Sequence, residues 1–213
     1  MKKTAIVLGA TGLTGRYLLD MLLASEDYAK VKVFTRRSTG RQHEKLEEII
    51  CDLLCLEDYG DNFVADEVFC CIGTTKAKTK ERELYRAIDY GIPFSAARLA
   101  ERNGIKTYSL ISAIGAKADS KVFYSRTKGE MEEAVLGCDI ENILIYRPSL
   151  IYGEREDRRL GESIAVKLSK FLELFFFGKF ERYKSISGKE LAKVLYNGVR
   201  KYSGHQIIFR NQF

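Results

Sequence analysis

Short apolar runs alternate along the chain with longer segments in which apolar residues recur every three or four positions. The short runs are rich in β-branched and aromatic residues, which is typical of strands buried on both faces of a sheet. The predicted strands are residues 4–8, 31–35, 48–51, 67–72, 107–111, 142–146 and 206–209. The periodic segments predict helices at residues 13–23, 83–102, 124–136, 164–175 and 189–201.

This alternation of strands and helices predicts an α/β fold with a doubly wound parallel sheet of the Rossmann type. The 213 residues suit a single domain, and only two prolines and no Ser- or Gly-rich tract leave no obvious linker. We therefore expect one domain over residues 1–213, in which residues 153–213 form a small helical appendage on the substrate side. Ligands of such sheets bind beyond the carboxyl ends of the strands, so residues at those ends are the candidates for function.

Composition excludes several classes of function. The hydrophobic fraction of 46% suits a globular core, and the net charge of +6 comes from basic residues interspersed with acidic ones. That mixture predicts a solvated mixed-charge surface and no nucleic-acid partner. The apolar run after Met1 ends at once at a glycine, so we expect no signal peptide.

The cysteines are five in number and fall mostly in apolar segments. An odd number in such places predicts reduced thiols in a cytoplasmic protein. The cysteines are Cys51, Cys55, Cys70, Cys71 and Cys138. Neither of the two histidines, His43 and His205, has zinc-ligand spacing, so we predict no metal site.

The most apolar stretch, residues 164–180, contains Lys167, Lys170 and Glu173. It is too short and too charged to span a bilayer, and no transmembrane segment is expected. The phenylalanines of residues 171–180 widen its apolar surface beyond one helical stripe. We interpret them first as core or pocket wall, second as a homodimer interface and third as a membrane contact.

Three glycines, Gly9, Gly12 and Gly15, separate the first predicted strand from the first helix. The first permits a tight turn, the second lets the backbone approach a pyrophosphate, and the third lets the helix pack on the strand. The start of the helix offers free N–H groups and a partial positive charge to phosphate. We predict that a dinucleotide binds here, held by Gly9, Thr11, Gly12, Leu13, Thr14 and Gly15.

The end of the second strand is expected to read the adenosine ribose. An acid there would bond a free 2′-hydroxyl and favour NAD, but the chain has Arg36 and Arg37. Guanidinium groups suit a 2′-phosphate, so we predict NADP in preference to NAD. The alternative is that one arginine is an ordinary surface residue. Asp52 follows the third strand and either meets the adenine edge or is an ordinary loop acid.

The fourth strand ends at Gly73, Thr74 and Thr75. Glycine allows the backbone to approach a cofactor, and the threonine hydroxyls can bond ribose or phosphate; a structural turn is the equal alternative. Pro148 ends the sixth strand, and the residues alone indicate only a strand stop there.

Tyr124 and Lys128 are four residues apart on one predicted helix face, and Ser112 follows the fifth strand. A lysine ammonium can lower the pKa of a phenol, which ordinarily lies at about 10, toward a value useful for proton transfer. Ser112 can hold a substrate oxygen beside Tyr124. Chance spacing on an amphipathic helix is the alternative, and the glycine turn weighs against it.

These motifs resemble the short-chain dehydrogenase/reductases in their extended and atypical division. The matching pieces are residues 9–15, Ser112, residues 124–128 and residues 147–153. Residues 70–76, with Gly129 and Glu130, are similar to the branch that contains Tat-interacting protein 2. The resemblance implies that Lys128 also bonds the nicotinamide ribose and that the backbone at Pro148 lines the carboxamide. We assign no residue to the asparagine that completes the proton relay in many members.

The sequence thus predicts an NADP-dependent oxidoreductase that transfers hydride between the cofactor and a small carbonyl or alcohol substrate. One alternative is an NADP(H)-binding regulatory protein with little turnover. Another is an epimerase or dehydratase that retains its cofactor. The intact set of Ser112, Tyr124 and Lys128 favours the oxidoreductase.

Overall fold

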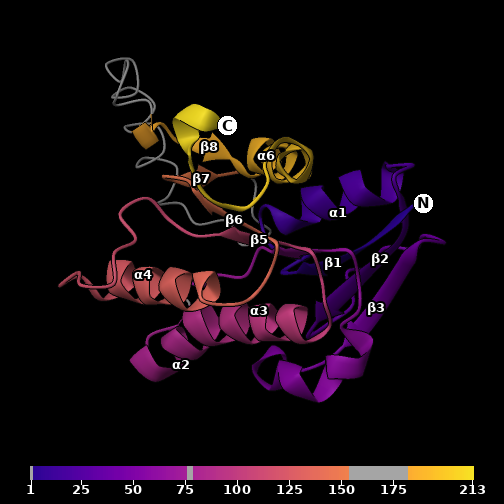
Figure 1. The fold of residues 1–213 in the computed structure, drawn as a ribbon, viewed down its shortest axis with the longest axis horizontal. Coiled ribbons are helices and arrows are strands. Elements are labelled where there is room, and N and C mark those ends of the chain that lie inside the picture. Colours follow the sequence, from indigo (N-terminus) through magenta and orange to yellow (C-terminus); the bar gives the residue numbers. More distant parts are fainter. Residues whose placement is uncertain (1, 76–78, 154–181) are drawn as a thin grey trace.

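The computed structural model describes residues 2–75, 79–153 and 182–213. Within these residues the centre of the molecule is a seven-stranded parallel sheet in the order β3-β2-β1-β4-β5-β6-β9 (Figure 1). Its strands are β1 (Lys3–Leu8), β2 (Tyr28–Thr35), β3 (Leu46–Ile50), β4 (Glu67–Cys70), β5 (Thr107–Ile111), β6 (Asn142–Arg147) and β9 (His205–Phe209). A separate pair, β7 (Ile151–Tyr152) and β8 (Ile186–Ser187), lies beside the carboxyl ends of the main strands.

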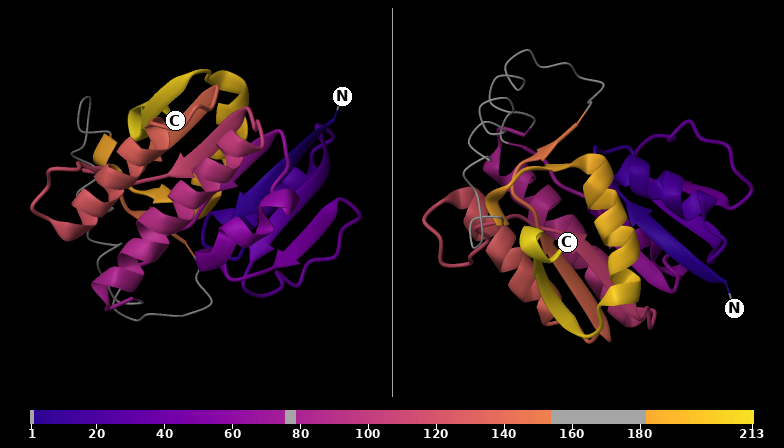
Figure 2. Two further views of the ribbon diagram at one scale, coloured as in Figure 1. Left: turned by 60° about the horizontal axis from the view of Figure 1, so that its bottom comes forward. Right: turned by 90° about the horizontal axis from the view of Figure 1, so that it is seen from above.

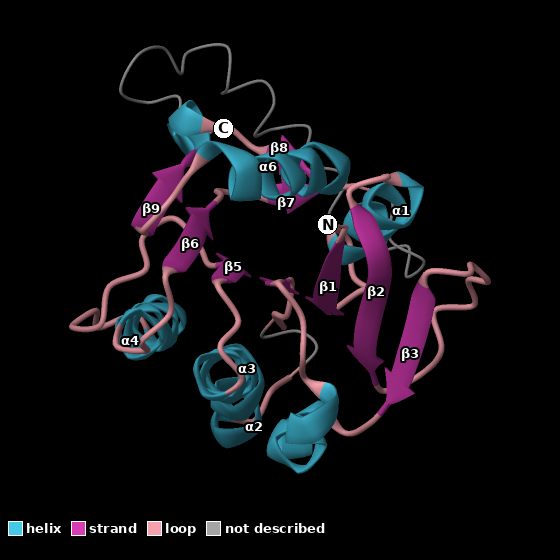
Figure 3. Ribbon diagram, turned by 45° about the vertical axis from the view of Figure 1, so that its right-hand side comes forward, coloured by secondary structure: helices cyan, strands magenta, loops and turns pink. Residues whose placement is uncertain are grey.

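Helices cover both faces of this sheet (Figure 3). On one face lie α1 (Gly15–Ala24) and α6 (Gly188–Lys201), which pack against each other. The other face is covered by helices that follow β3, β4 and β5. They are the 3₁₀ segment η1 (Leu53–Asn62), α2 (Arg82–Arg86), the π-helical segment η2 (Ala87–Gly91), α3 (Ile92–Arg102) and α4 (Phe123–Leu136).

Alternation along the strands builds a separate hydrophobic core on each face. In β1, Ile6 and Leu8 belong to the core beneath α3 and η1, whereas Ala5 and Val7 belong to the core beneath α1 and α6. All four side chains are fully buried. Because successive strand residues point to opposite faces, a strand covered on both sides must be apolar throughout.

The sheet changes direction between β1 and β4. The chain runs from β1 outward through β2 to β3, and then crosses back to β4 and continues outward through β5 and β6 (Figure 2). The ends of β1 and β4 are adjacent, since Cys71 donates its backbone N–H to the Leu8 carbonyl at 2.9 Å. A crevice at such a switch point is where α/β sheets bind their ligands.

The predicted fold is confirmed, and the main departures are local. The helix expected at residues 83–102 is interrupted by the π turn η2, while η1, β7 and β8 were not predicted. Of the C-terminal part, α6 and β9 belong to the main sheet and its helix layer, and the helix expected at residues 164–175 lies outside the described residues, as does the Phe-rich segment 171–180. No helix in the described ranges is both long and apolar enough to cross a membrane.

Candidate cofactor and active site

The glycine turn joins β1 to α1 by backbone contacts that exclude larger residues. Gly9 has a φ of +80°, and a Cβ there would lie 2.7 Å from the Cys71 carbonyl oxygen. A Cβ on Gly15 would lie 2.2 Å from the Gly9 carbonyl oxygen, and the Gly12 N–H donates to that same oxygen at 2.9 Å. The turn is therefore too tight for side chains at Gly9 and Gly15, and its backbone is left bare at the mouth of the crevice.

The start of α1 is suited to an anion. Its cap residue Thr14 makes no side-chain cap bond, and the first turn carries no acidic residue. Within the described part of the chain, the N–H groups of Leu13 and Thr14 donate no backbone hydrogen bond. Unused N–H groups and the positive end of the helix dipole together favour a phosphate.

A cavity of about 430 Å³ lies beside this turn. It is lined by Gly9, Thr11, Phe34, Thr35, Arg36, Arg37, Leu53 and Ile72. Both guanidinium groups are exposed, and no carboxylate among the described residues pairs with either of them. The predicted phosphate-reading arginines are thus brought together with the predicted glycine turn.

Asp52 caps a helix in the structure, and its predicted contact with adenine stays a prediction. Its carboxylate accepts a hydrogen bond from the Leu54 N–H at 3.0 Å and so caps η1. Leu53, rather than Asp52, lines the cavity, together with Phe34 and Ile72. Sequence reasoning missed these three apolar residues: Phe34 lies in β2, Ile72 follows β4, and Leu53 begins η1.

Ser112 is held at the end of β5 by the neighbouring strand. Its N–H donates to the Tyr146 carbonyl at 2.8 Å, and the Ile114 N–H donates to the Pro148 carbonyl at 2.8 Å. The Ser112 side chain is 4% exposed, and its Oγ has no hydrogen-bond partner among the described residues. A buried hydroxyl without a partner is uncommon in folded proteins, so Ser112 has hydrogen-bonding capacity for a ligand.

Tyr124 lies in the first turn of α4, and its side chain is 41% exposed. Lys128, one turn later, is buried, and its Nζ lies 2.9 Å from Oδ1 of the fully buried Asp89. Desolvation raises the pKa of the Tyr124 phenol; the Lys128 ammonium lowers it and Asp89 raises it. The net direction is upward, opposite to the lowering that the sequence led us to expect, because desolvation has the largest effect and the carboxylate offsets part of the effect of the ammonium.

Asp89 is a further site residue that sequence reasoning missed. It belongs to the π turn η2, and its Oδ2 accepts a hydrogen bond from the Thr74 N–H at 2.7 Å. The available signal was its register: Tyr85 and Ile92, four residues before and three after, face the core, so an acid between them is also turned inward.

The loop after β4 passes directly over the ion pair. A Cβ on Gly73 would lie 3.6 Å from Asp89 Oδ1 and 3.9 Å from Lys128 Nζ. The Thr74 hydroxyl is within 2.9 Å of the Thr79 hydroxyl, whereas Thr75 is exposed. Gly73 and Lys128 are therefore neighbours, and Thr74 is at least partly committed to holding its own loop.

The loop after β5 is fixed against α4. The Lys117 N–H donates to the Ser125 carbonyl at 3.0 Å, and a Cβ on Gly129 would lie 2.2 Å from the Ala118 nitrogen. Helix and loop backbones are thus in direct contact beside Lys128. This contact couples the position of Ser112, at the base of the loop, to that of Tyr124.

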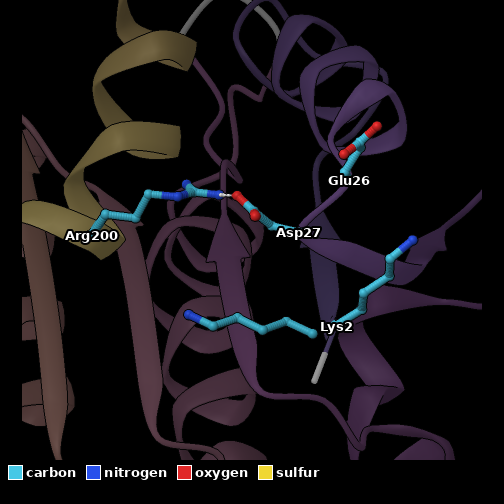
Figure 4. Close-up of a pocket in the computed structure, with 5 residues that line it drawn as sticks. Lys2, Glu26, Asp27 and Arg200 are labelled. Atoms are coloured by element: carbon cyan, nitrogen blue, oxygen red, sulfur yellow. Dashed lines mark hydrogen bonds and ion pairs between the residues drawn. The ribbon is translucent and has the colours of Figure 1, made fainter.

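A second cavity lies at the opposite, amino-terminal edge of the sheet. Its lining residues Lys2, Lys3, Glu26, Asp27 and Arg200 carry charges of both signs, and the Arg200 guanidinium points at Asp27 with an N–O distance of 2.6 Å (Figure 4). These residues are far from the switch point at which α/β sheets bind ligands. In the described ranges, no group of three or more His, Cys, Asp or Glu side chains is arranged to hold a metal ion.

The sheet, the switch point and the glycine turn are those of NAD(P)-binding Rossmann proteins. The chain belongs to the NAD dependent epimerase/dehydratase family, whose pattern it matches over residues 5–182. The curated relatives include Protein FMP52-1, mitochondrial, of Scheffersomyces stipitis, which is 32% identical over 208 residues, or 93% of this chain and 88% of the relative. Protein HTATIP2 of Rattus norvegicus is 31% identical over 169 residues, or 78% of this chain and 69% of the relative.

Solved structures share the fold at low sequence identity. The UDP-N-acetylglucosamine 4-epimerase from Methanobrevibacter ruminantium M1 has a TM-score of 0.73 and 19% identity, covering 98% of this chain and 77% of that chain. A wide-type short-chain dehydrogenase/reductase from Veillonella parvula in complex with NADP has a TM-score of 0.64 and 15% identity, covering 94% and 88%.

The relatives confirm one prediction and contradict another. The predicted likeness to the Tat-interacting protein 2 branch of the extended short-chain dehydrogenase/reductases is confirmed. The predicted cytoplasmic location is wrong by this comparison, because FMP52 proteins of Scheffersomyces stipitis and Candida albicans are named mitochondrial. None of the five cysteines forms a disulfide in the structure.

Proposed function

We propose that the protein is an NADP-dependent oxidoreductase acting on a small carbonyl or alcohol substrate. The observation that supports it most is the exposed Tyr124 phenol one helical turn from the buried Lys128 ammonium, beside the loop at Gly73. Carbonyl reduction needs a phenol that the substrate can reach, a fixed cation and a serine hydroxyl without another partner. Tyr124, Lys128 and Ser112 offer these groups at the carboxyl edge of the sheet.

The residues around the glycine turn fit a dinucleotide. The bare backbone at Gly9 and Gly12, with the open start of α1 at Leu13, Thr14 and Gly15, would hold the pyrophosphate. Thr11 and Thr75 are exposed and able to donate hydroxyl hydrogen bonds. The remaining cofactor contacts that we propose are Arg36, Arg37, Asp52, Gly73, Thr74, Tyr124, Lys128 and Pro148.

Selection of NADP rests on the exposed Arg36 and Arg37, which have no partner carboxylate among the described residues. A guanidinium binds phosphate through two parallel hydrogen bonds, and no acid competes with a 2′-phosphate at the end of β2. The bound cofactor would supply the hydride, and the protein would supply position and proton transfer.

Ser112, Tyr124 and Lys128 would carry out the proton chemistry. The Ser112 hydroxyl would donate a hydrogen bond to the carbonyl oxygen and hold it beside Tyr124. The phenol would then protonate that oxygen as the carbonyl carbon is reduced. Lys128 would hold its ammonium on the same helix face as the phenol, and its pairing with Asp89 would set how much of that charge the phenol experiences.

The family favours one competing function, an epimerase or dehydratase that retains its cofactor. An NADP(H)-binding regulatory protein with little turnover is the other alternative. We further propose that residues 1–213 form one domain whose part from about residue 153 contributes to the substrate side, and that a homodimer is compatible with this arrangement.

The direct test incubates the purified protein with NADPH and a panel of small aldehydes and ketones and follows loss of reduced nicotinamide. Net consumption of NADPH with at least one carbonyl supports the oxidoreductase. Binding of NADPH without consumption across the panel supports the regulatory alternative. Conversion of a sugar nucleotide in a parallel incubation, without net consumption of coenzyme, supports the epimerase.

The choice of coenzyme has its own test. Arg36→Ala should weaken NADPH binding by about tenfold or more, since a charged hydrogen bond is lost, and leave NADH binding nearly unchanged. Arg98→Ala is the matched control, because Arg98 is an exposed arginine on α3 that pairs with Glu101. Equal losses of NADPH and NADH affinity in Arg36→Ala would contradict the NADP assignment.

A further inference from the structure

The ion pair of Lys128 and Asp89 is more deeply buried than any other ion pair among the described residues. The side chains are 4% and 1% exposed, and the distance from Nζ to Oδ1 is 2.9 Å. Removing two charges from water is costly, and the cost is offset only when each has good partners. The two carboxylate oxygens differ: Oδ2 accepts the Thr74 N–H at 2.7 Å, whereas Oδ1 faces the ammonium at 2.9 Å and makes no hydrogen bond among the described residues.

A local irregularity of the backbone places this carboxylate. Asp89 lies in the middle of the π turn η2, between α2 and α3. A π turn widens a helix by one residue, and such turns are frequent at functional sites. Asp89 therefore joins three parts of the candidate site: the helix pair α2–α3, the loop at Thr74 and, through Lys128, the helix α4.

The carboxylate also changes what Tyr124 experiences. A lone ammonium one turn away would stabilise a phenolate, whereas an ammonium paired at 2.9 Å acts as one end of a neutral pair. The titratable groups that face the pair are Tyr124 on α4, Tyr85 on α2 and Cys70 on β4. Burial raises the pKa of both the Tyr85 phenol and the Cys70 thiol, so neither adds a charge at neutral pH.

We propose that Asp89 is a positioning residue that fixes the Lys128 ammonium and offsets its charge at Tyr124, so that Tyr124 is a proton donor and the site is set for carbonyl reduction. The direction of the reaction rests on the proposed function. The charge balance, by which Asp89 offsets the Lys128 charge at Tyr124, does not. In reduction the bound NADPH would supply a hydride to the carbonyl carbon and leave as NADP⁺, and Tyr124 would give its proton to the carbonyl oxygen. The phenolate left on Tyr124 regains a proton from solvent.

The test measures the pKa of Tyr124 in the protein without cofactor, by NMR of chain labelled with ¹³C at the tyrosine ring carbon that bears the oxygen. The Tyr124 signal is identified by its absence from Tyr124→Phe. In the wild-type chain we expect a pKa at or above the ordinary value of about 10. Asp89→Asn should lower it by about one unit or more, because the ammonium then acts alone.

Two variants separate this effect from a general change of charge. Asp89→Glu keeps the carboxylate and should restore most of the wild-type pKa. Glu133→Gln removes an exposed acid from α4, the helix that carries Tyr124, and should leave the Tyr124 pKa unchanged. An unchanged Tyr124 pKa in a folded Asp89→Asn, or a wild-type value near neutrality, would overturn the proposal.

The double variant Asp89→Asn/Lys128→Met keeps the proposal falsifiable if Asp89→Asn alone does not fold, since it removes both buried charges together. In this double variant the pKa of Tyr124 should stay close to its wild-type value, because the wild-type pair already adds little net charge. A Tyr124 pKa that rises by more than about one unit in the double variant would mean that Lys128 acts as an uncompensated cation, and would overturn the proposal. If the pKa shifts hold but the chain binds no NADPH, the proposed function fails and the charge balance stands.

Discussion

Two groups of a tyrosine, a lysine and a carboxylate lie at opposite edges of the sheet, and their exposure is inverted. At the amino-terminal edge, the fully buried Tyr28 donates to Glu67 Oε2 at 2.5 Å, and the half-exposed Lys3 lies 2.5 Å from Oε1. At the carboxyl edge, the lysine and the acid are buried, and the tyrosine is 41% exposed. The same three chemical groups occur in both places.

The difference shows that the arrangement, and not the residue types, defines the candidate site. Tyr28 has used its hydrogen bond on Glu67 and has no route to a ligand. Tyr124 can reach a ligand, and its cation is held still by Asp89. Tyr28 is therefore expected to contribute to stability and Tyr124 to chemistry, and the paired substitutions below separate these roles.

The largest expected effect is on turnover. Tyr124→Phe should lower kcat by about 10²-fold or more, because it removes the proposed proton donor, whereas Tyr28→Phe should leave kcat within about twofold. Both are measured with the carbonyl that the panel identifies. NADPH affinity in Tyr124→Phe should stay close to wild type. A similar loss of kcat in the two variants would erase the distinction between the edges.

Stability should show the reverse order. Tyr28→Phe leaves the buried Glu67 with one hydrogen bond fewer and should cost about 1–3 kcal/mol of unfolding free energy. Tyr124→Phe should change it by less than about 0.5 kcal/mol, because the exposed phenol makes no hydrogen bond among the described residues. Urea unfolding at neutral pH measures both, and a larger loss in Tyr124→Phe would reverse the assignment.

Alkaline pH sharpens the contrast. Burial raises the pKa of Tyr28 most, and the charge of Glu67 raises it further. The folded chain therefore keeps a proton on Tyr28 that the unfolded chain loses above about pH 10. Stability is therefore present below that pH and falls above it, by about 1.4 kcal/mol per pH unit for this one group. Tyr28→Phe should flatten the fall in unfolding free energy by about that amount. An unchanged slope would contradict the buried state of Tyr28.

The smallest effect is expected at the charged cavity of Figure 4. The pKa of Asp27 is lowered by the hydrogen bond and the charge of Arg200, but both side chains are well exposed, so solvent screens the pair. Asp27→Asn should leave Tm and kcat unchanged in calorimetry and in the turnover assay. A marked drop of Tm would show that the amino-terminal edge depends on this pair as well as on Tyr28.

The fold could be predicted because strands buried on both faces are mostly apolar, as residues 5–8 of β1 and 68–70 of β4 are. The glycine turn could be predicted because the backbone contacts of Gly9 and Gly15 tolerate no side chain. Asp89 could not be predicted as Lys128's partner, because its register indicates only burial and the pairing depends on how α4 packs against η2. The role of Asp52 was open for a similar reason: an acid after a strand serves equally as a helix cap.

The most direct test of the central claim is a calorimetric titration of the purified chain with NADPH and, separately, with NADH. The account predicts saturable binding of NADPH at a single site, with NADH weaker. It also predicts the same NADPH affinity for Tyr124→Phe, since the glycine turn and the arginines hold the cofactor. Absence of binding heat and of competition with either coenzyme, in a chain shown to be folded, would contradict it.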